Sequence, residues 1–93
     1  MKTKGKKTLA YEHWRDTEAK PYLDKTFGHV CNVVGCDVTE RLDVDHILNR
    51  STHPDLVRSL TNVQYLCTHH HYLKTYHITE LEYKTCQELK PVD

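Results

Sequence analysis

The stretch from Leu66 to Thr75 reads LCTHHHYLKT and carries three consecutive histidines shortly after a cysteine. Two positions separate Cys67 from His70 in this stretch, and four positions separate an earlier pair, Cys31 and Cys36. Two pairs of ligands at such spacings can bind one zinc ion in a tetrahedron. We therefore predict a structural Zn²⁺ held by three cysteines and one histidine.

Spacing alone leaves the fourth zinc ligand open, because His69 and His71 flank His70. Buried thiols that bind no metal are the alternative interpretation of the cysteines. The remaining cysteine, Cys86, is predicted to be a thiol in the core. The sequence contains no secretory signal pattern and no stretch apolar enough to span a membrane, so we expect a reducing, cytoplasmic environment that favours metal-bound thiolates over disulfides.

The chain is short and poor in apolar residues, which makes a cross-link valuable. It has 93 residues, of which 38% are hydrophobic and 28% are charged. A domain of this size buries a smaller share of its surface than a larger domain, and a metal often supplies the missing stability. The formal net charge is zero, yet four lysines fall within the first seven residues. We predict a disordered basic tail over residues 1–8, either solvated or attracting phosphates, and a single domain over residues 9–93.

The order of the expected elements predicts a small α+β domain. The elements are a helix, a metal knuckle, two strands and two helices, at residues 8–20, 31–36, 40–47, 62–67, 68–76 and 80–89. Pro21 is expected to stop or kink the first helix, and Gly35 suits a tight turn with positive φ. The first strand is predicted from alternation of apolar and polar residues, and a short helical turn is expected after Pro54. Thr79 and Glu82 form a capping-box pattern, which predicts the last helix.

Two parts of the sequence, LDVDHI at residues 42–47 and NVQYLCTHHHYLKT at residues 62–75, resemble the HNH endonuclease family. The resemblance is to the small zinc-stapled members found in phage genomes, and it covers roughly residues 11–76. It implies a ββα-metal fold with flanking N- and C-terminal helices. His70 stands where the family usually has a fourth cysteine, and His71 matches the final histidine, which binds the catalytic metal. Neighbouring helix residues point about 100° apart, so these two histidines can serve two different ions.

The resemblance and the chemistry point to the same residues for phosphodiester cleavage. The reaction needs a group that takes a proton from water and a cation that neutralises charge on the phosphate and the departing oxygen. His46 is the expected general base, because an imidazole titrates near neutral pH. Asp45 and His71 are expected to hold a catalytic divalent ion, for which the resemblance suggests Mg²⁺, Mn²⁺ or another transition metal, and to leave coordination positions open. The family motif gives Asn62 a role either in orienting the loop that bears the base or near the metal.

Three further residues complete the expected site. Lys74 and Arg50 are predicted to contact phosphates, although basic residues on a small domain are more often simply exposed. Thr75 stands where some family members have a further histidine, and it is a poor ligand. The catalytic ion is therefore expected to be bound weakly and partly through water.

These assignments predict a metal-dependent DNA endonuclease that nicks or cuts with little sequence preference, because phosphate contacts carry no base information. The resemblance implies 5′-phosphate and 3′-hydroxyl products and a helix lying against the minor groove. For phage members it also implies assistance to terminase in DNA packaging, within the cytoplasm of a bacterial host. We expect a monomer or a weak dimer. The alternative is a non-catalytic zinc module that binds nucleic acid or protein, in which Asp45, His46 and Asn62 are incidental; a redox or disulfide protein is a weaker rival.

Overall fold

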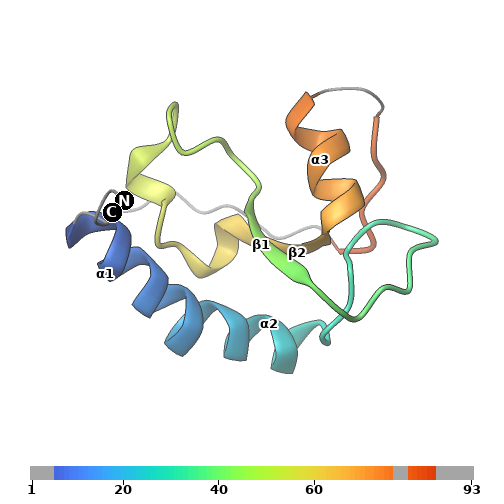
Figure 1. The fold of residues 1–93 in the computed structure, drawn as a ribbon, viewed down its shortest axis with the longest axis horizontal. Helices are drawn as coiled ribbons and strands as arrows, with labels where there is room; N and C mark the ends of the chain where they lie inside the picture. The colour runs from blue at the N-terminus through green and yellow to red at the C-terminus, as the bar shows by residue number, and fades with distance from the viewer. Residues whose placement is uncertain (1–5, 77–79, 86–93) are drawn as a thin grey trace, which may run out of the picture.

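The computed structural model describes residues 6–76 and 80–85. Its helices and strands are α1 (Lys6–Trp14), α2 (Lys20–Thr26), β1 (Leu42–His46), β2 (Val63–Cys67) and α3 (Thr68–Tyr76), with short 3₁₀ turns at Pro54–Leu56 and Leu60–Asn62. The strand pair lies between a long helical arm, formed by α1 and α2, and the shorter α3 (Figure 1). The protein is thus a small α+β domain, as predicted. Among the described residues, no helix has the length and apolar character that a membrane crossing requires.

The helical arm continues past Pro21 instead of ending there, so the expectation of a stop is wrong. Between α1 and α2, residues Arg15–Ala19 form a π-helical turn in which the Lys20 N–H donates to the Arg15 carbonyl, five residues back. Proline clashes with the carbonyl four residues before it and donates no hydrogen bond. A wider turn just before the proline gives its ring room, and the helix then runs on to Thr26. The arm begins at Lys6, so residues 6–8 of the expected tail are helical, while residues 1–5 lie outside the described residues.

The two strands are antiparallel and divide the core into two small clusters. In their register, Leu42 lies opposite Cys67 and Asp45 lies opposite Gln64. One cluster packs the strands against the helical arm, and its buried members are Ala19, Leu23, Val63 and Tyr65. The other lies toward the cysteines, and its buried members are Cys31, Val33, Leu66 and Cys67. Neither cluster is large, which agrees with the expected need for a cross-link.

The predicted C-terminal helix is wrong over its first six residues, because residues 80–85 are extended. Leu81, Tyr83 and Thr85 are half-buried while the residues between them are exposed, which is the period of a strand. Tyr83 forms an isolated antiparallel bridge with Val33, where the Val34 N–H donates to the Glu82 carbonyl at 2.8 Å. Pairing with this distant segment outweighs the local helix signal. Thr79, Cys86 and the rest of the expected helix lie outside the described residues.

Candidate functional site

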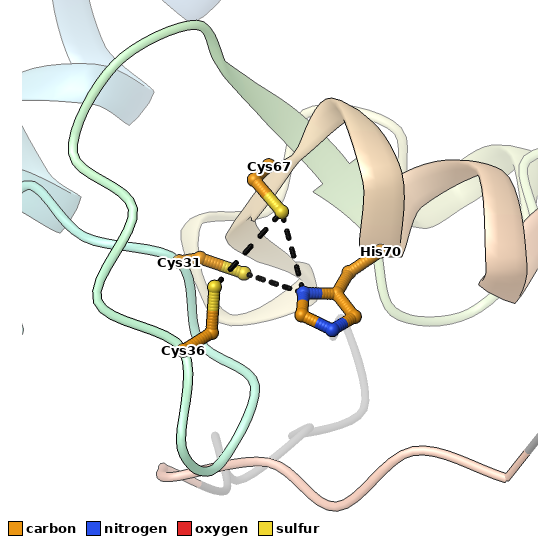
Figure 2. Close-up of side chains that lie close together, drawn as sticks. All are labelled: Cys31, Cys36, Cys67 and His70. Carbon is orange, nitrogen blue, oxygen red and sulfur yellow. Dashed lines mark hydrogen bonds between the residues drawn. The ribbon is translucent and has the colours of Figure 1, made fainter.

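Four side chains predicted as zinc ligands meet at one point, and we call them the Cys3His cluster: Cys31, Cys36, Cys67 and His70. Figure 2 shows the three sulfurs and the imidazole pointing toward a common centre. Their ligand atoms all lie within 4.8 Å of one another, and no other such group of three or more ligands occurs among the described residues. This part of the prediction is confirmed as a cluster that can hold a metal ion.

The distances within the Cys3His cluster fit a tetrahedral ion. Cys36 Sγ and Cys67 Sγ are 4.0 Å apart, and His70 Nδ1 lies 3.3 Å from Cys67 Sγ and 3.5 Å from Cys31 Sγ. Around zinc, the edges of such a tetrahedron are about 3.8 Å between two sulfurs and about 3.6 Å between sulfur and nitrogen. The cluster therefore has the size of a closed four-ligand shell.

The local structure of the knuckle explains why the first two cysteines converge. The Cys36 N–H donates to the Val33 carbonyl at 3.0 Å and closes a turn. Gly35, inside this turn, has φ +83°, a conformation that favours glycine. The predicted role of Gly35 is thus confirmed. Lys84, from the extended C-terminal segment, donates from Nζ to the carbonyls of Cys31 and Cys36 and braces the turn from outside.

The thiols of the cluster sit in unequal surroundings. Burial raises the pKa of Cys31 to about 11. Burial also tends to raise the pKa of Cys36, but the Val38 backbone N–H, the neighbouring thiols and the charge on Lys84 together outweigh it, so this pKa is lowered. Cys31, Cys36 and Cys67 form no disulfide. Three thiols this close together can ionise together only with a cation between them, which a metal site would supply.

A second group of predicted residues lines a cleft of about 820 Å³ between β1, α3 and the start of the helical arm, which we call the β1–α3 cleft. Five of the predicted site residues line it: Asp45, His46, Arg50, His71 and Lys74. The two strands and α3 thus bring together side chains that are far apart in the sequence. Asp45 and Lys74, for example, are 29 positions apart. The cleft also holds residues of both charge signs, including Asp43 and Arg15.

Asp45 is 5% exposed, and its carboxylate is held by one side chain of β2 and one of α3. Gln64, its partner across the strands, donates from Nε2 to Asp45 Oδ2 at 3.0 Å. Lys74 Nζ lies 3.2 Å from Asp45 Oδ1 and 3.0 Å from Oδ2, and it also donates to the His46 carbonyl at 2.9 Å. Lys74, expected to contact phosphate, is therefore paired with the carboxylate expected to hold the ion.

His46 is also buried, at 9% exposed, as its place on the face of Leu42 and Val44 predicts, whereas the burial of Asp45 breaks the strict alternation expected along β1. The ring packs against Tyr11, with 5.3 Å between ring centroids, and Nε2 lies 2.9 Å from the Val57 carbonyl oxygen. A carbonyl only accepts, so Nε2 carries the proton and Nδ1 keeps its lone pair in the neutral ring. Burial lowers the pKa of His46, which favours the neutral ring further. These are the properties of a general base.

His71 spans two carboxylates of β1. Its Nδ1 lies 3.1 Å from Asp43 Oδ2, and its Nε2 lies 3.6 Å from Asp45 Oδ1. At a bond length of about 2.1 Å, two ligands are about 3.0 Å apart in neighbouring octahedral positions and about 3.4 Å apart in a tetrahedron. The second distance is slightly wider than either, so a small movement of the two side chains would let them share a cation. His70, the next residue back, points into the Cys3His cluster, so the expected division between adjacent histidines is geometrically present.

Asn62 is fully buried and lies away from the β1–α3 cleft. Its Oδ1 accepts from the Leu48 N–H at 2.8 Å, and its Nδ2 donates to the carbonyls of Leu48 and Leu56 at 3.3 and 3.2 Å. The next residue after Leu56 is Val57, the partner of His46. Of the two roles left open by the sequence, the contacts match orientation of the loop that supports His46.

The other expected residues are placed with fewer contacts. The Arg50 guanidinium lies over the Tyr11 ring, 4.9 Å from its centroid, at the edge of the cleft. The Thr75 hydroxyl donates to the His71 carbonyl at 2.8 Å, one helical turn back. His69 is exposed, as expected for a residue without a ligand role.

Three residues that line the cleft or hold its side chains in place were not identified from the sequence. Asp43 lies two positions before Asp45 on the same strand face, and this spacing could have drawn attention to it. Gln64 acts through the strand register, and Tyr11 acts through the packing of the helical arm; neither relation is visible in a local pattern. Comparison of the chain with family models, with curated proteins and with solved structures gave no match.

Proposed function

We propose that this protein is a metal-dependent endonuclease of the HNH type that hydrolyses phosphodiester bonds in DNA. The observation that carries the proposal is the meeting of Asp45, His46 and His71 in one cleft, with His46 held by a carbonyl on Nε2. The order strand, strand, helix around this cleft agrees with the ββα-metal fold that the sequence resemblance implies. The Cys3His cluster, in this proposal, holds a structural Zn²⁺ that ties the knuckle to the end of β2 and the start of α3.

His46 takes the proton of the attacking water on Nδ1. The Val57 carbonyl keeps the other nitrogen protonated, and Asn62 holds the loop on which Val57 lies. As Nδ1 gains a proton, the ring becomes a cation, and the Val57 carbonyl dipole stabilises it through Nε2. The ring needs no rearrangement for this step because Tyr11 and the loop already fix its position.

Asp45 and His71 provide one oxygen and one nitrogen ligand for a divalent cation. When bound, such a cation neutralises charge on the phosphate and stabilises the departing oxygen. Gln64 fixes the Asp45 carboxylate from the opposite strand, so the ligand is oriented in advance. Two protein ligands leave most of a coordination shell to water and phosphate, which is typical of a catalytic site and unlike the four-ligand cluster nearby.

Phosphate groups entering the cleft meet Arg50 and Arg15 along its walls, whereas the charge of Lys74 is already paired with Asp45. The charge of the two arginines offsets that of the DNA backbone, and contacts of this kind give little base specificity. Assistance to terminase in phage DNA packaging remains a proposal drawn from the family resemblance alone.

Plasmid nicking in the presence of Mg²⁺ or Mn²⁺ tests the proposal through His46→Ala. We expect the variant to stay folded, to keep its zinc and to lose cleavage by about 10²- to 10⁴-fold, the usual contribution of a general base. His69→Ala, an exposed histidine outside the cleft, is the control and should cut like the parent. A His46→Ala variant that nicks at the parent's rate would overturn the assignment of the base.

A second candidate function is a non-catalytic zinc module that binds nucleic acid or protein. The ion pair between Lys74 and the buried Asp45 favours it, because this pair can compensate the carboxylate without any divalent ion. Absence of nicking by the zinc-loaded parent with every divalent metal tried, together with retained DNA binding, would support this function over cleavage.

A further inference from the structure

We propose that Asp43, which the sequence analysis did not single out, is a positioning residue that holds His71 as a ligand of the catalytic ion. The inference rests on the proposed function, and it concerns how the Asp45–His71 pair is kept ready for a cation. Asp43 touches neither the ion nor the DNA in this proposal. It acts only through the imidazole of His71.

The contact itself is specific to one ring nitrogen. Asp43 Oδ2 lies 3.1 Å from His71 Nδ1, whereas the other nitrogen, Nε2, lies 3.6 Å from Asp45 Oδ1. A carboxylate only accepts, so it selects the tautomer with the proton on Nδ1. That tautomer leaves the lone pair on Nε2, the nitrogen that points toward Asp45. The same contact also raises the basicity of the ligating nitrogen.

The strand makes this arrangement possible. Asp43 and Asp45 are two residues apart on β1, so their side chains lie on one face of the strand, about 7 Å apart along it. α3 lies next to the strand pair (Figure 1). His71 reaches from α3 between the two carboxylates. One carboxylate can therefore hold the ring while the other shares the cation with it.

Exposure separates the tasks of the two carboxylates. The Asp43 side chain is 48% exposed and that of Asp45 is 6% exposed. A half-exposed hydrogen bond contributes little to stability, so the proposed value of Asp43 lies in orientation. Asp45 has two further partners, Gln64 and Lys74. Among the described contacts, Asp43 contacts His71 and no other charged side chain of α3.

The experiment compares Asp43→Ala with Asp43→Asn in zinc-loaded protein. Both variants lose the negative charge, but asparagine keeps an oxygen that can accept from Nδ1. Mn²⁺ affinity, followed by electron paramagnetic resonance, should fall by about 10- to 100-fold in Asp43→Ala and by much less in Asp43→Asn, while zinc content stays unchanged. Nicking by Asp43→Ala should recover at high Mn²⁺. Asp55→Ala, an exposed acidic residue outside the cleft, is the control and should behave as the parent.

Three results would overturn the proposal. Equal loss of Mn²⁺ affinity in both variants would mean that Asp43 contributes only charge, and unchanged affinity in Asp43→Ala would mean that it contributes nothing.

¹⁵N-detected tautomer spectra of His71, recorded in mildly alkaline buffer, test the proposal without any measurement of DNA cleavage. The parent should carry the proton on Nδ1 and Asp43→Ala should not. If the His71 ring of the parent carries its proton on Nε2, the role of Asp43 is refuted even if the protein cuts DNA. If the proton is on Nδ1 but the protein cuts no DNA, the contact of Asp43 with His71 stands and the proposed nuclease function fails.

Discussion

The Cys3His cluster and the β1–α3 cleft differ in how many ligand atoms they could offer a cation. The cluster offers four ligand atoms within 4.8 Å of one another. The cleft offers Asp45 and His71, whose nearest ligand atoms are 3.6 Å apart, in a cavity of about 820 Å³. A closed shell suits an ion that holds the fold, and an open one suits an ion that must also bind substrate. His70 and His71 are adjacent on α3, yet each belongs to a different one of these sites.

The largest expected effect tests whether the cluster alone carries the fold. His70→Ala should lose zinc and its cooperative unfolding transition together. In zinc-finger peptides, bound zinc supplies about 10–16 kcal/mol of apparent free energy, which is comparable with the whole stability of a small domain, about 5–15 kcal/mol. Zinc content by metal analysis, together with thermal unfolding followed by the fluorescence of the single tryptophan, measures both.

The neighbouring histidine supplies the matched variant for this test. His71→Ala should keep zinc and fold but lose most Mn²⁺ binding and metal-activated cutting, because one of the two cleft ligands is gone. Equal zinc loss in His70→Ala and His71→Ala would show that the two sites are not separate, and the comparison would fail.

A smaller effect is expected from substitution of Asn62, which holds the loop behind the cleft in place. Asn62→Ala removes the acceptor for the Leu48 N–H and the donor to the Leu56 carbonyl. Each buried polar group left without a partner costs about 1–3 kcal/mol, and the loop that carries Val57 should loosen. Urea denaturation of the zinc-loaded protein should show the loss of stability, and nicking should fall with zinc content unchanged.

Ser51→Ala is the control for the loop, because Ser51 is exposed, lies outside the cleft and bonds through its hydroxyl only to Asn49 in the described contacts. It should leave stability and cutting close to the parent. An Asn62→Ala variant as stable as the parent would contradict the contacts that we assign to this residue.

The smallest expected effect concerns how easily a divalent ion can reach Asp45 in the cleft. Lys74→Met removes the ammonium beside both oxygens of Asp45, so a divalent ion no longer competes with it. Mn²⁺ affinity should rise by about two- to tenfold, within the range of a partly exposed ion pair. Arg50→Met removes the same charge from the same cleft without touching Asp45, and it should raise the affinity less. Equal gains in the two variants would assign the effect to net charge alone.

The sequence predicted the features that depend on local spacing. The two ligand pairs predicted the Cys3His cluster, the runs of apolar residues predicted β1 and β2, and the helical character of residues 68–76 predicted α3. One error arose where a distant segment decides the local structure, and another where a local irregularity lets a helix continue. Residues 80–85 carry a helix signal but pair with the knuckle near Val33, and the helix passes Pro21 because a π-helical turn precedes it.

The details of the cleft were predictable only in part. Asp45, His46 and His71 line it as expected, since they lie on elements that the patterns identified. The pairing of Lys74 with Asp45 and the contact of Asp43 with His71 depend on how α3 crosses β1. That crossing is set by packing between elements, so no motif in the sequence encodes it directly.

The segment that carries Lys84 supplies no ligand to the cluster, yet it holds the backbone of two ligands in place. Lys84 Nζ donates to the carbonyls of Cys31 and Cys36, and Tyr83 bridges to Val33 between them. A protein shortened before residue 80 would therefore keep all four ligand side chains but lose these contacts. A bound ion should then exchange faster with a chelator than it does in the parent.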